Sequence, residues 1–312
     1  MKFFSILLSL ASSSLIHAAE DVTAIREGQQ VVIRTGKHEI LRYQAEPGGL
    51  PRPEIPKSQL RGGYIQSIHT PTGRLVTDDF PADHPHHHGV WNPWTKTEFE
   101  GRHPDFWNMG NKTGRVEFVK LDSVWQKEGV AGFTSFHRLI DMTASPEKAA
   151  LLDTWTVMAR VDRGAYLIDF TSTQTCASDS PLDLLQYRYG GLGFRGHAAW
   201  NGAGNCQFLT ASGQTDRLKI DTSREKWCWI GGKVDGETCG VLILGHPDND
   251  RFPQPVRANP DQPFFCFAPV QLGGMRIAPG HPYISHYRLI VMDGPPNAAD
   301  AERRWQEYAA GR

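Results

Sequence analysis

The stretch ALLDTWTVMARVDRGAYLIDFTSTQT, residues 150–175, decides the fold. Two runs rich in apolar, β-branched and aromatic residues, 150–161 and 166–175, lie on either side of the turn signal Asp162-Arg163-Gly164. Apolar residues that alternate with polar ones are typical of a strand with one buried face. A short turn that contains glycine joins such strands in an antiparallel hairpin. The stretch therefore predicts a β-hairpin.

Runs of the same kind recur along the chain. The further candidate strands are 31–34, 64–69, 116–124, 133–141, 184–189, 227–230, 239–244, 264–267 and 284–292. Short strands at this spacing, with turn signals between them, favour an antiparallel sandwich over βαβ units. A helix is predicted at 297–310, where Trp305 and Tyr308 form a stripe, and we expect it to cap an edge or end of the sandwich. The expected fold is all-β: a large antiparallel β-sandwich with a short C-terminal helix.

Composition and charge exclude several classes of protein. Hydrophobic residues make up 39% of the 312 residues, which is too many for a disordered chain. The 31 Gly and 21 Pro would interrupt the long helices of a helical bundle. The formal net charge of -1 leaves no basic excess to neutralise phosphates, so we expect no nucleic-acid partner. Residues 20–312 are expected to form one domain.

The N-terminal residues 1–19 have the pattern of a signal peptide: Lys2, a short apolar run at 3–10, and a small-residue cleavage site at 16–18. That run is too short to span a bilayer and no later run approaches the required length, so we expect no membrane span in the mature chain. The pattern predicts a periplasmic or secreted protein. All five cysteines lie beyond this segment without a CxxC pair. We expect mostly buried thiols and at most two disulfides.

The strongest chemical signal is DHPHHHGVW, residues 83–91, which holds four of the 13 histidines. In an extended backbone His84, His86 and His88 would share one face and His87 the other. Imidazoles bind transition metals, so His84 and His86 are candidates for holding a divalent metal ion. Imidazoles also titrate nearest neutrality, so His86 and His87 are candidates for general acid and base. The alternative is a hydrogen-bonded histidine cluster that ties a loop to the sheet.

The same long loop, 77–113, carries three tryptophans, and loops of this length are usually functional. Trp91 and Trp107 are candidates for stacking on a sugar ring, whose faces are apolar and whose edges are polar. Trp94 could extend that platform, and Asp105 is a candidate for binding substrate hydroxyls. The alternative is that the tryptophans fill one end of the sandwich.

A third motif, GHPDNDR at 245–251, follows an apolar strand. His246, Asp248 and Arg251 offer a base or metal ligand, a carboxylate and an anion-binding guanidinium, and are candidate catalytic residues. A structural Asx-turn after a strand has the same composition. The GxGxxG spelling at 191–196 is not a dinucleotide site, because no βαβ context surrounds it.

Together these motifs resemble a bacterial family known as PmoA-like or DUF6807. The motifs that carry the resemblance are, in order, Asp83-His84-Pro85-His86-His87 with Gly89 and Trp91, Asp105-Phe106-Trp107, Tyr189-Gly190-Gly191-Leu192-Gly193, Trp227-Cys228, His246-Pro247-Asp248-Asn249 with Arg251, Arg257, and Asp293-Gly294. The resemblance covers most of the mature chain. It implies a galactose-mutarotase-like β-supersandwich from polysaccharide-degrading bacteria, and it adds Asn249 and Arg257 to the candidate substrate-binding residues.

The chain departs from this family in two places. His88 stands where many relatives have Arg, and the Trp-His pair that precedes Arg257 in relatives is absent. The PmoA label itself implies a membrane subunit of a methane oxygenase, which a mature chain without a membrane span contradicts.

The leading hypothesis is a secreted carbohydrate-directed enzyme, a hydrolase or a lyase that acts on a sugar or modified sugar. The histidine cluster and the 245–251 loop would face each other across one end of the sandwich. His87 would act as acid or base, Arg251 would hold a hydroxyl, keto or carboxylate group, and Trp107 would stack on the sugar. The alternatives are a non-catalytic carbohydrate-binding protein and a copper or iron oxygenase.

Overall fold

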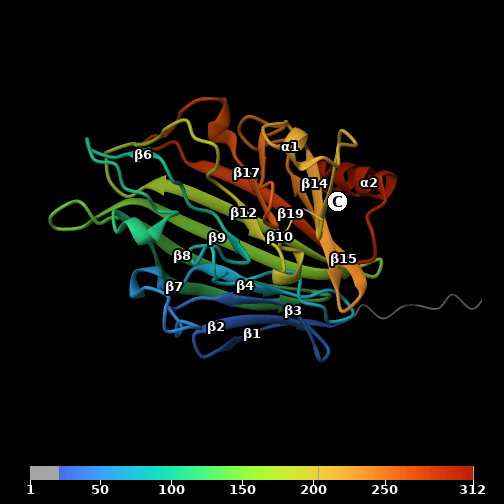
Figure 1. Ribbon diagram of the computed structural model, residues 1–312. Helices are drawn as coiled ribbons and strands as arrows, with labels where there is room; N and C mark the ends of the chain where they lie inside the picture. The colour runs from blue at the N-terminus through green and yellow to red at the C-terminus, as the bar shows by residue number, and fades with distance from the viewer. Residues whose placement is uncertain (1–20, 203, 312) are drawn as a thin grey trace, which may run out of the picture.

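Two large antiparallel sheets stacked on each other make up most of the molecule (Figure 1). A computed structural model describes residues 21–202 and 204–311. The predicted signal peptide at 1–19 lies outside the described residues. The expected antiparallel β-sandwich is confirmed.

The first sheet has eight strands in the order β1-β2-β3-β4-β5-β12-β17-β16. Their bounds are β1 Val22–Glu27, β2 Gln30–Thr35, β3 His38–Gln44, β4 Tyr64–Ile68, β5 Val90–Trp91, β12 Gly193–Arg195, β17 Phe264–Phe267 and β16 Val256–Ala258. The last four strands are short and come from three distant parts of the sequence, since only β16 and β17 are close along the chain. Their adjacency brings the loops at 81–89, 188–192 and 257–264 together.

The second sheet has eight strands in the order β13-β14-β15-β19-β10-β9-β8-β7. Their bounds are β13 Cys206–Thr210, β14 Trp227–Val234, β15 Glu237–Gly245, β19 Tyr283–Asp293, β10 Ala165–Cys176, β9 Lys148–Asp162, β8 Val130–Asp141 and β7 Gly114–Lys127. The predicted hairpin at 150–175 is β9 and β10, which pair from Ala165 opposite Asp162 to Cys176 opposite Leu151.

The remaining elements are short. A three-stranded sheet is formed by β18 Met275–Ile277, β11 Leu182–Leu184 and β6 Thr97–Glu98. The α-helices are α1 Arg217–Ile220 and α2 Ala298–Ala309, and the 3-10 helices are η1 Lys57–Gln59, η2 Met109–Asn111, η3 Ala198–Trp200 and η4 Pro269–Leu272. The short C-terminal helix is therefore confirmed.

The main core lies between the two large sheets and follows the strand alternation. On β9, Trp155, Val157 and Ala159 are buried at every second position, and they pack with Ile33 and Tyr43 of the first sheet. Burial of one face of each sheet removes a continuous apolar surface from water, which is the main force that holds the sandwich together.

Helix α2 covers the outer face of the second sheet, not an edge or end of the sandwich as we expected. Its Ala301 and Tyr308 pack with Trp227, Trp229 and Leu242, whose neighbours in sequence point into the main core. The Asn297 side chain caps the helix by accepting a hydrogen bond from the backbone N–H of Asp300. The outer face of β14 and β15 is apolar, so it needs this cover.

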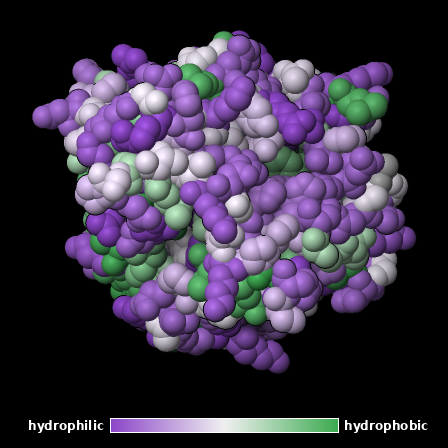
Figure 2. Space-filling view, turned by 60° about the vertical axis from the view of Figure 1, so that its left-hand side comes forward, coloured by the Kyte–Doolittle hydropathy of each residue, from purple (hydrophilic) through white to green (hydrophobic). Residues whose placement is uncertain are grey.

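Other expectations can be compared with the described chain. All five cysteines are free thiols and four of them are buried, so the expectation of mostly buried thiols is confirmed. Across the described residues, no helix combines the length and the apolar character needed to cross a bilayer. The GxGxxG residues 191–196 include strand β12 and do not open a helix, which agrees with the rejection of a dinucleotide site. The face shown in Figure 2 is mostly hydrophilic, with hydrophobic residues in small separate groups.

Candidate functional site

Three of the clustered histidines line one cavity, which we call the His pocket. It has a volume of about 220 Å³ and includes His84, His86 and His87. The other lining residues are the amides Asn108, Asn259 and Gln262, the arginines Arg188 and Arg257, and the rings of Tyr189 and Phe264. The pocket lies beside β5, β12, β17 and β16, on the outer face of the first sheet. On this face Trp91 and Phe264 pack together, whereas their neighbours Val90 and Phe265 point into the main core.

A turn in the backbone groups the three histidines. The N–H of His87 donates to the carbonyl of His84 at 2.8 Å, and the N–H of His84 donates to the carbonyl of Pro81 at 3.1 Å. The segment is therefore not extended, and the expected sharing of one face by His84, His86 and His88 is wrong. The ring centroids of His84, His86 and His87 lie 4.7–5.5 Å apart.

Burial keeps two of these imidazoles neutral. Burial lowers the pKa of His86 to about 4, with a smaller contribution from the charges of His84 and His88. Burial also holds the pKa of His87 well below its usual value. The His87 ring is 5% exposed and stacks on Phe264 with 4.9 Å between centroids. At neutral pH both rings are therefore uncharged.

His84 is held by its neighbours through Nδ1. The amide nitrogen of Gln262 lies 2.8 Å from Nδ1, and a carboxylate oxygen of Asp83 lies 3.3 Å away. The same amide nitrogen donates to Asp83 at 2.6 Å. Because the Gln262 amide donates, Nδ1 accepts, and the neutral ring then carries its proton on Nε2. His84 is thus oriented as a hydrogen-bond donor.

The facing groups supply a hydroxyl and positive charge. Burial raises the pKa of Tyr189 to about 12, so its hydroxyl stays protonated. The Arg188 guanidinium lies 5.6 Å from the centre of the Tyr189 ring, and its side chain is exposed. Arg257 contacts the carboxylate of Asp221 at 2.5 Å. Arg188 is therefore the arginine of this pocket that is available to an anionic group.

His88 belongs to another part of the structure. Its side chain is fully buried, Nδ1 donates to Asp79 at 2.6 Å, and the ring stacks on Tyr64 with 4.0 Å between centroids. It anchors the histidine segment to β4, and it does not line the His pocket.

The tryptophans form the floor beneath the pocket. Trp91 and Trp107 have no exposed surface, and their ring centroids lie 4.9 Å apart. Trp94 is also buried and donates to Gln174 at 2.6 Å. None of them presents a face to a ligand, so the expected stacking platform is corrected to a packed support. The ring of Phe264 occupies that position in the pocket instead.

Asp105 organises its own loop. One carboxylate oxygen accepts hydrogen bonds from the backbone N–H groups of Trp107 and Asn108, at 2.9 and 2.8 Å, and the other accepts from the Asn108 side chain. It positions Asn108, which lines the pocket, and is not itself among the lining residues.

The 245–251 loop lies elsewhere. Asp248 and Arg251 line a different cavity, which shares no lining residue with the His pocket. The Arg251 guanidinium donates to the backbone carbonyls of Pro269, Gly273 and Gly274 at 2.7–2.8 Å. The structure therefore does not bring this loop to the histidine cluster as expected.

The other residues of this loop also have structural contacts. The Asn249 side chain donates to and accepts from the backbone of His286, at 2.8 and 2.7 Å. The His246 ring packs against Tyr308 with 5.1 Å between centroids. These contacts hold the loop against β19 and α2.

The metal hypothesis gains no support from the geometry. In the described part of the chain, no group of three or more His, Cys, Asp or Glu side chains is arranged to hold a metal ion. A site at His84 and His86 remains a prediction.

One family model matches residues 30–306, and its description is "Family of unknown function (DUF6807)". The chain belongs to the DUF6807 family. The resemblance seen in the sequence motifs is thereby confirmed, but the PmoA-like label is not part of that description. No curated protein matches the chain.

Solved structures show only a distant likeness. A galactose mutarotase related enzyme from Lactobacillus acidophilus matches with a TM-score of 0.38 and 9% identity, over 86% of this chain and 97% of that one. The GH36 α-galactosidase AgaB from Geobacillus stearothermophilus matches with a TM-score of 0.35 and 12% identity, over 87% of this chain. This DUF6807 chain spans 39% of the length of AgaB. TM-scores this low support no inference about activity.

The sequence motifs missed several lining residues: Asn108, Arg188, Tyr189, Asn259, Gln262 and Phe264. Tyr189 is the first residue of a family motif, and Asn108 and Arg188 adjoin such motifs, so their position was a usable signal. Gln262 and Phe264 come from β17 and the turn before it. Nothing in their local sequence marks them, because they reach the pocket through strand pairing.

Proposed function

We propose that this DUF6807 protein is an exported enzyme that acts on a sugar, and that it breaks a C–O bond by elimination, as a lyase. One observation carries the proposal: the His pocket combines neutral imidazoles with a protonated Tyr189 and an available Arg188, and no Asp or Glu is among its lining residues. This composition provides a base, an acid and a positive charge.

The absence of carboxylates among these lining residues favours elimination over hydrolysis. Most glycoside hydrolases use two Asp or Glu residues on opposite sides of the scissile bond, one as acid and one as base or nucleophile. Asp83, the carboxylate beside His84, is occupied with His84, Gln262 and Arg195. A hydrolase of that kind would need a pair of carboxylates, which the lining residues of this pocket do not supply.

The proposed reaction starts from a sugar with a carboxylate or keto group beside an acidic C–H. His86 removes this proton, and the electron pair of the broken C–H bond forms a carbon–carbon double bond as the C–O bond at the next carbon breaks. Tyr189 gives its proton to the leaving oxygen. Arg188 and the Nε2–H of His84 stabilise the negative charge that develops on the carboxylate or keto oxygen.

The remaining lining residues fit a sugar. Three amides, Asn108, Asn259 and Gln262, offer donors and acceptors for hydroxyl groups, and the ring of Phe264 offers an apolar contact. The predicted signal peptide agrees with a substrate outside the cytoplasm.

The test is turnover of an oligosaccharide panel that includes uronate-bearing and keto sugars. We expect a product with a conjugated double bond, detected by ultraviolet absorbance and mass spectrometry. His86→Gln and Tyr189→Phe should each lower kcat by about a hundredfold or more, the usual contribution of a general acid or base. His281→Gln, at an exposed site outside the pocket, is the matched control.

Two outcomes would refute the lyase reaction. New reducing ends without a double bond would show hydrolysis. Saturable sugar binding without any product would show a non-catalytic carbohydrate-binding protein.

A further inference from the structure

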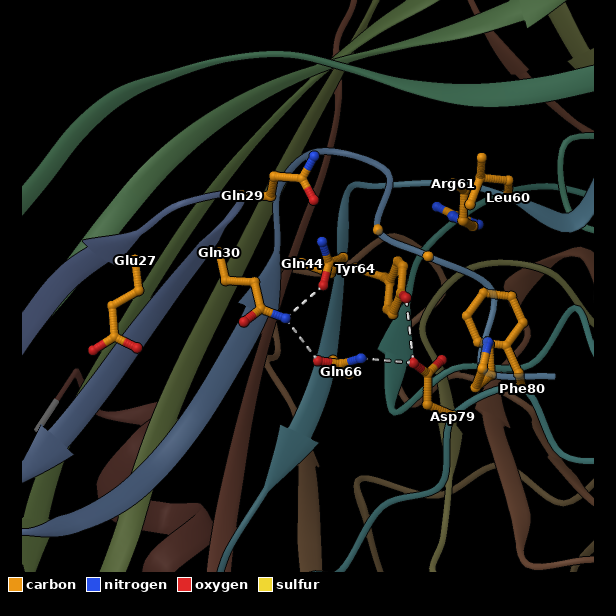
Figure 3. A pocket seen from close by; sticks show the side chains of 13 residues that line it. Glu27, Gln29, Gln30, Gln44, Leu60, Arg61, Tyr64, Gln66, Asp79 and Phe80 are labelled. Atoms are coloured by element: carbon orange, nitrogen blue, oxygen red, sulfur yellow. Dashed lines mark hydrogen bonds between the residues drawn. The ribbon is translucent and has the colours of Figure 1, made fainter.

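A second cavity, larger than the His pocket, lies on the same sheet beside β2, β3 and β4. Its volume is about 360 Å³, and the buried Arg61 is among its lining residues (Figure 3). We call it the Arg61 pocket. It shares no lining residue with the His pocket.

One wall of the Arg61 pocket is a connected row of polar side chains. The Gln30 amide nitrogen donates to Gln44 at 2.6 Å and to Gln66 at 3.1 Å, and Gln66 donates to Asp79 at 3.1 Å. The Tyr64 hydroxyl donates to the same Asp79 oxygen at 3.2 Å, as Figure 3 shows. These contacts hold amide and hydroxyl groups in place before any ligand arrives, which lowers the entropy cost of binding.

Arg61 is a buried charge without a carboxylate partner. Only 3% of its surface is exposed. Its Nε and Nη2 contact the backbone carbonyls of Gly62 and Gly63 at 3.2 and 3.3 Å, and Nη1 is buried with no hydrogen-bond partner. Burial lowers the pKa of Arg61 to about 10, so the group is still charged at neutral pH. Burying a charge without a partner costs free energy, and a ligand that carries the opposite charge would offset this cost.

Most other buried arginines of the described chain do contact a carboxylate. Arg288 pairs with Asp169 at 2.5 Å, Arg304 with Asp300 at 2.7 Å, and Arg195 contacts Asp83 at 3.4 Å. Arg217 instead donates to three backbone carbonyls at 2.8–3.2 Å. Arg61 has no carboxylate contact and only two carbonyl contacts, at 3.2 and 3.3 Å, which leave Nη1 without a partner.

The other charged groups of the pocket are already engaged. Glu27 pairs with Arg34 and Arg42, at 2.5 and 3.6 Å. Asp79 accepts hydrogen bonds from Tyr64, Gln66 and His88. The charge of Arg61 is therefore the one that a ligand could neutralise.

We propose that the Arg61 pocket is a second ligand site, which binds a sugar unit that carries a carboxylate. Arg61 pairs with the carboxylate, since its planar guanidinium matches that group. The amides of Gln30, Gln44 and Gln66 and the hydroxyl of Tyr64 bind the sugar hydroxyls. This proposal is independent of the reaction in the His pocket, because the two sites have no residue in common.

The test is calorimetric titration of the full chain with D-glucuronate, with neutral D-glucose as the comparison ligand. We expect glucuronate to bind and glucose to bind much more weakly. Arg61→Met should weaken glucuronate binding by about tenfold or more, the loss expected for a charged hydrogen-bonded pair. Arg138→Met, at an exposed site outside both pockets, is the matched control and should leave this affinity within about twofold. Arg188→Met reports any binding of glucuronate in the His pocket instead.

A thermal unfolding curve shows whether Arg61→Met is folded. If it is not, Tyr64→Phe removes only a hydroxyl and should weaken glucuronate binding severalfold. The proposal is overturned if wild type does not bind glucuronate, if glucose binds equally well, or if Arg188→Met alone removes binding. If wild type binds glucuronate but turns over no member of the oligosaccharide panel, the result counts against the lyase reaction and not against the Arg61 pocket.

Discussion

Replacing His86 by glutamine removes a group whose protonation opposes folding in acid. Burial lowers the pKa of His86 to about 4, whereas the unfolded chain has the ordinary histidine value of about 6.5. Between these two values the unfolded chain binds a proton that the folded chain does not. The free energy of unfolding therefore falls as the pH drops through this window.

The size of the effect follows from the two pKa values. Between pH 7.5 and pH 5.0, the proton on unfolded His86 lowers the free energy of unfolding by about 2 kcal/mol. Glutamine is uncharged at every pH, so His86→Gln loses this contribution. His87 and His137 also have pKa values lowered by burial, and they keep their own contributions in the variant.

The assay is urea unfolding of wild type and His86→Gln at pH 7.5 and pH 5.0. We expect wild type to lose about 2 kcal/mol more than the variant over this interval. The exposed His281→Gln serves as the control for loss of an imidazole as such. Equal losses in wild type and His86→Gln would mean that burial does not lower the pKa of the His86 ring, and the reasoning from its burial would be refuted.

Three further outcomes test the packing. A Cβ at Gly193 would lie 2.8 Å from the Trp107 ring, so Gly193→Ala should destabilise by about 1–3 kcal/mol in urea unfolding; Gly204→Ala, where nothing lies within 4 Å, should not. Asn297→Ala should lower the free energy of unfolding by about 1 kcal/mol because the N-cap of α2 is lost, and Asn297→Asp should retain it. Thiol titration without reductant should find five reactive groups in denaturant and far fewer in the folded protein, and a count of three would reveal a disulfide.

Local patterns predicted the parts of this fold that depend on nearest neighbours. The alternation at 150–175 predicted the β9–β10 hairpin, since side chains on a strand point to opposite faces whatever the strand pairs with. The helix at 297–310 was predictable because its stripe of Trp305 and Tyr308 lies within one segment. That α2 covers the outer face of the second sheet was not visible, because its partners come from β14 and β15.

In the candidate site, too, some features follow from local sequence and others from tertiary contacts. The sequence by itself determined the all-β class and placed four histidines within one short segment, but it did not determine which of them share a pocket. Only the tertiary structure decided that a turn aims the three rings into one pocket, that Arg251 is held by backbone carbonyls, and that Trp91 and Trp107 are buried. The reason is that β5, β12 and β17 are adjacent through pairing between distant segments. That pairing, which no local pattern encodes, brings Tyr189, Gln262 and Phe264 to the histidines.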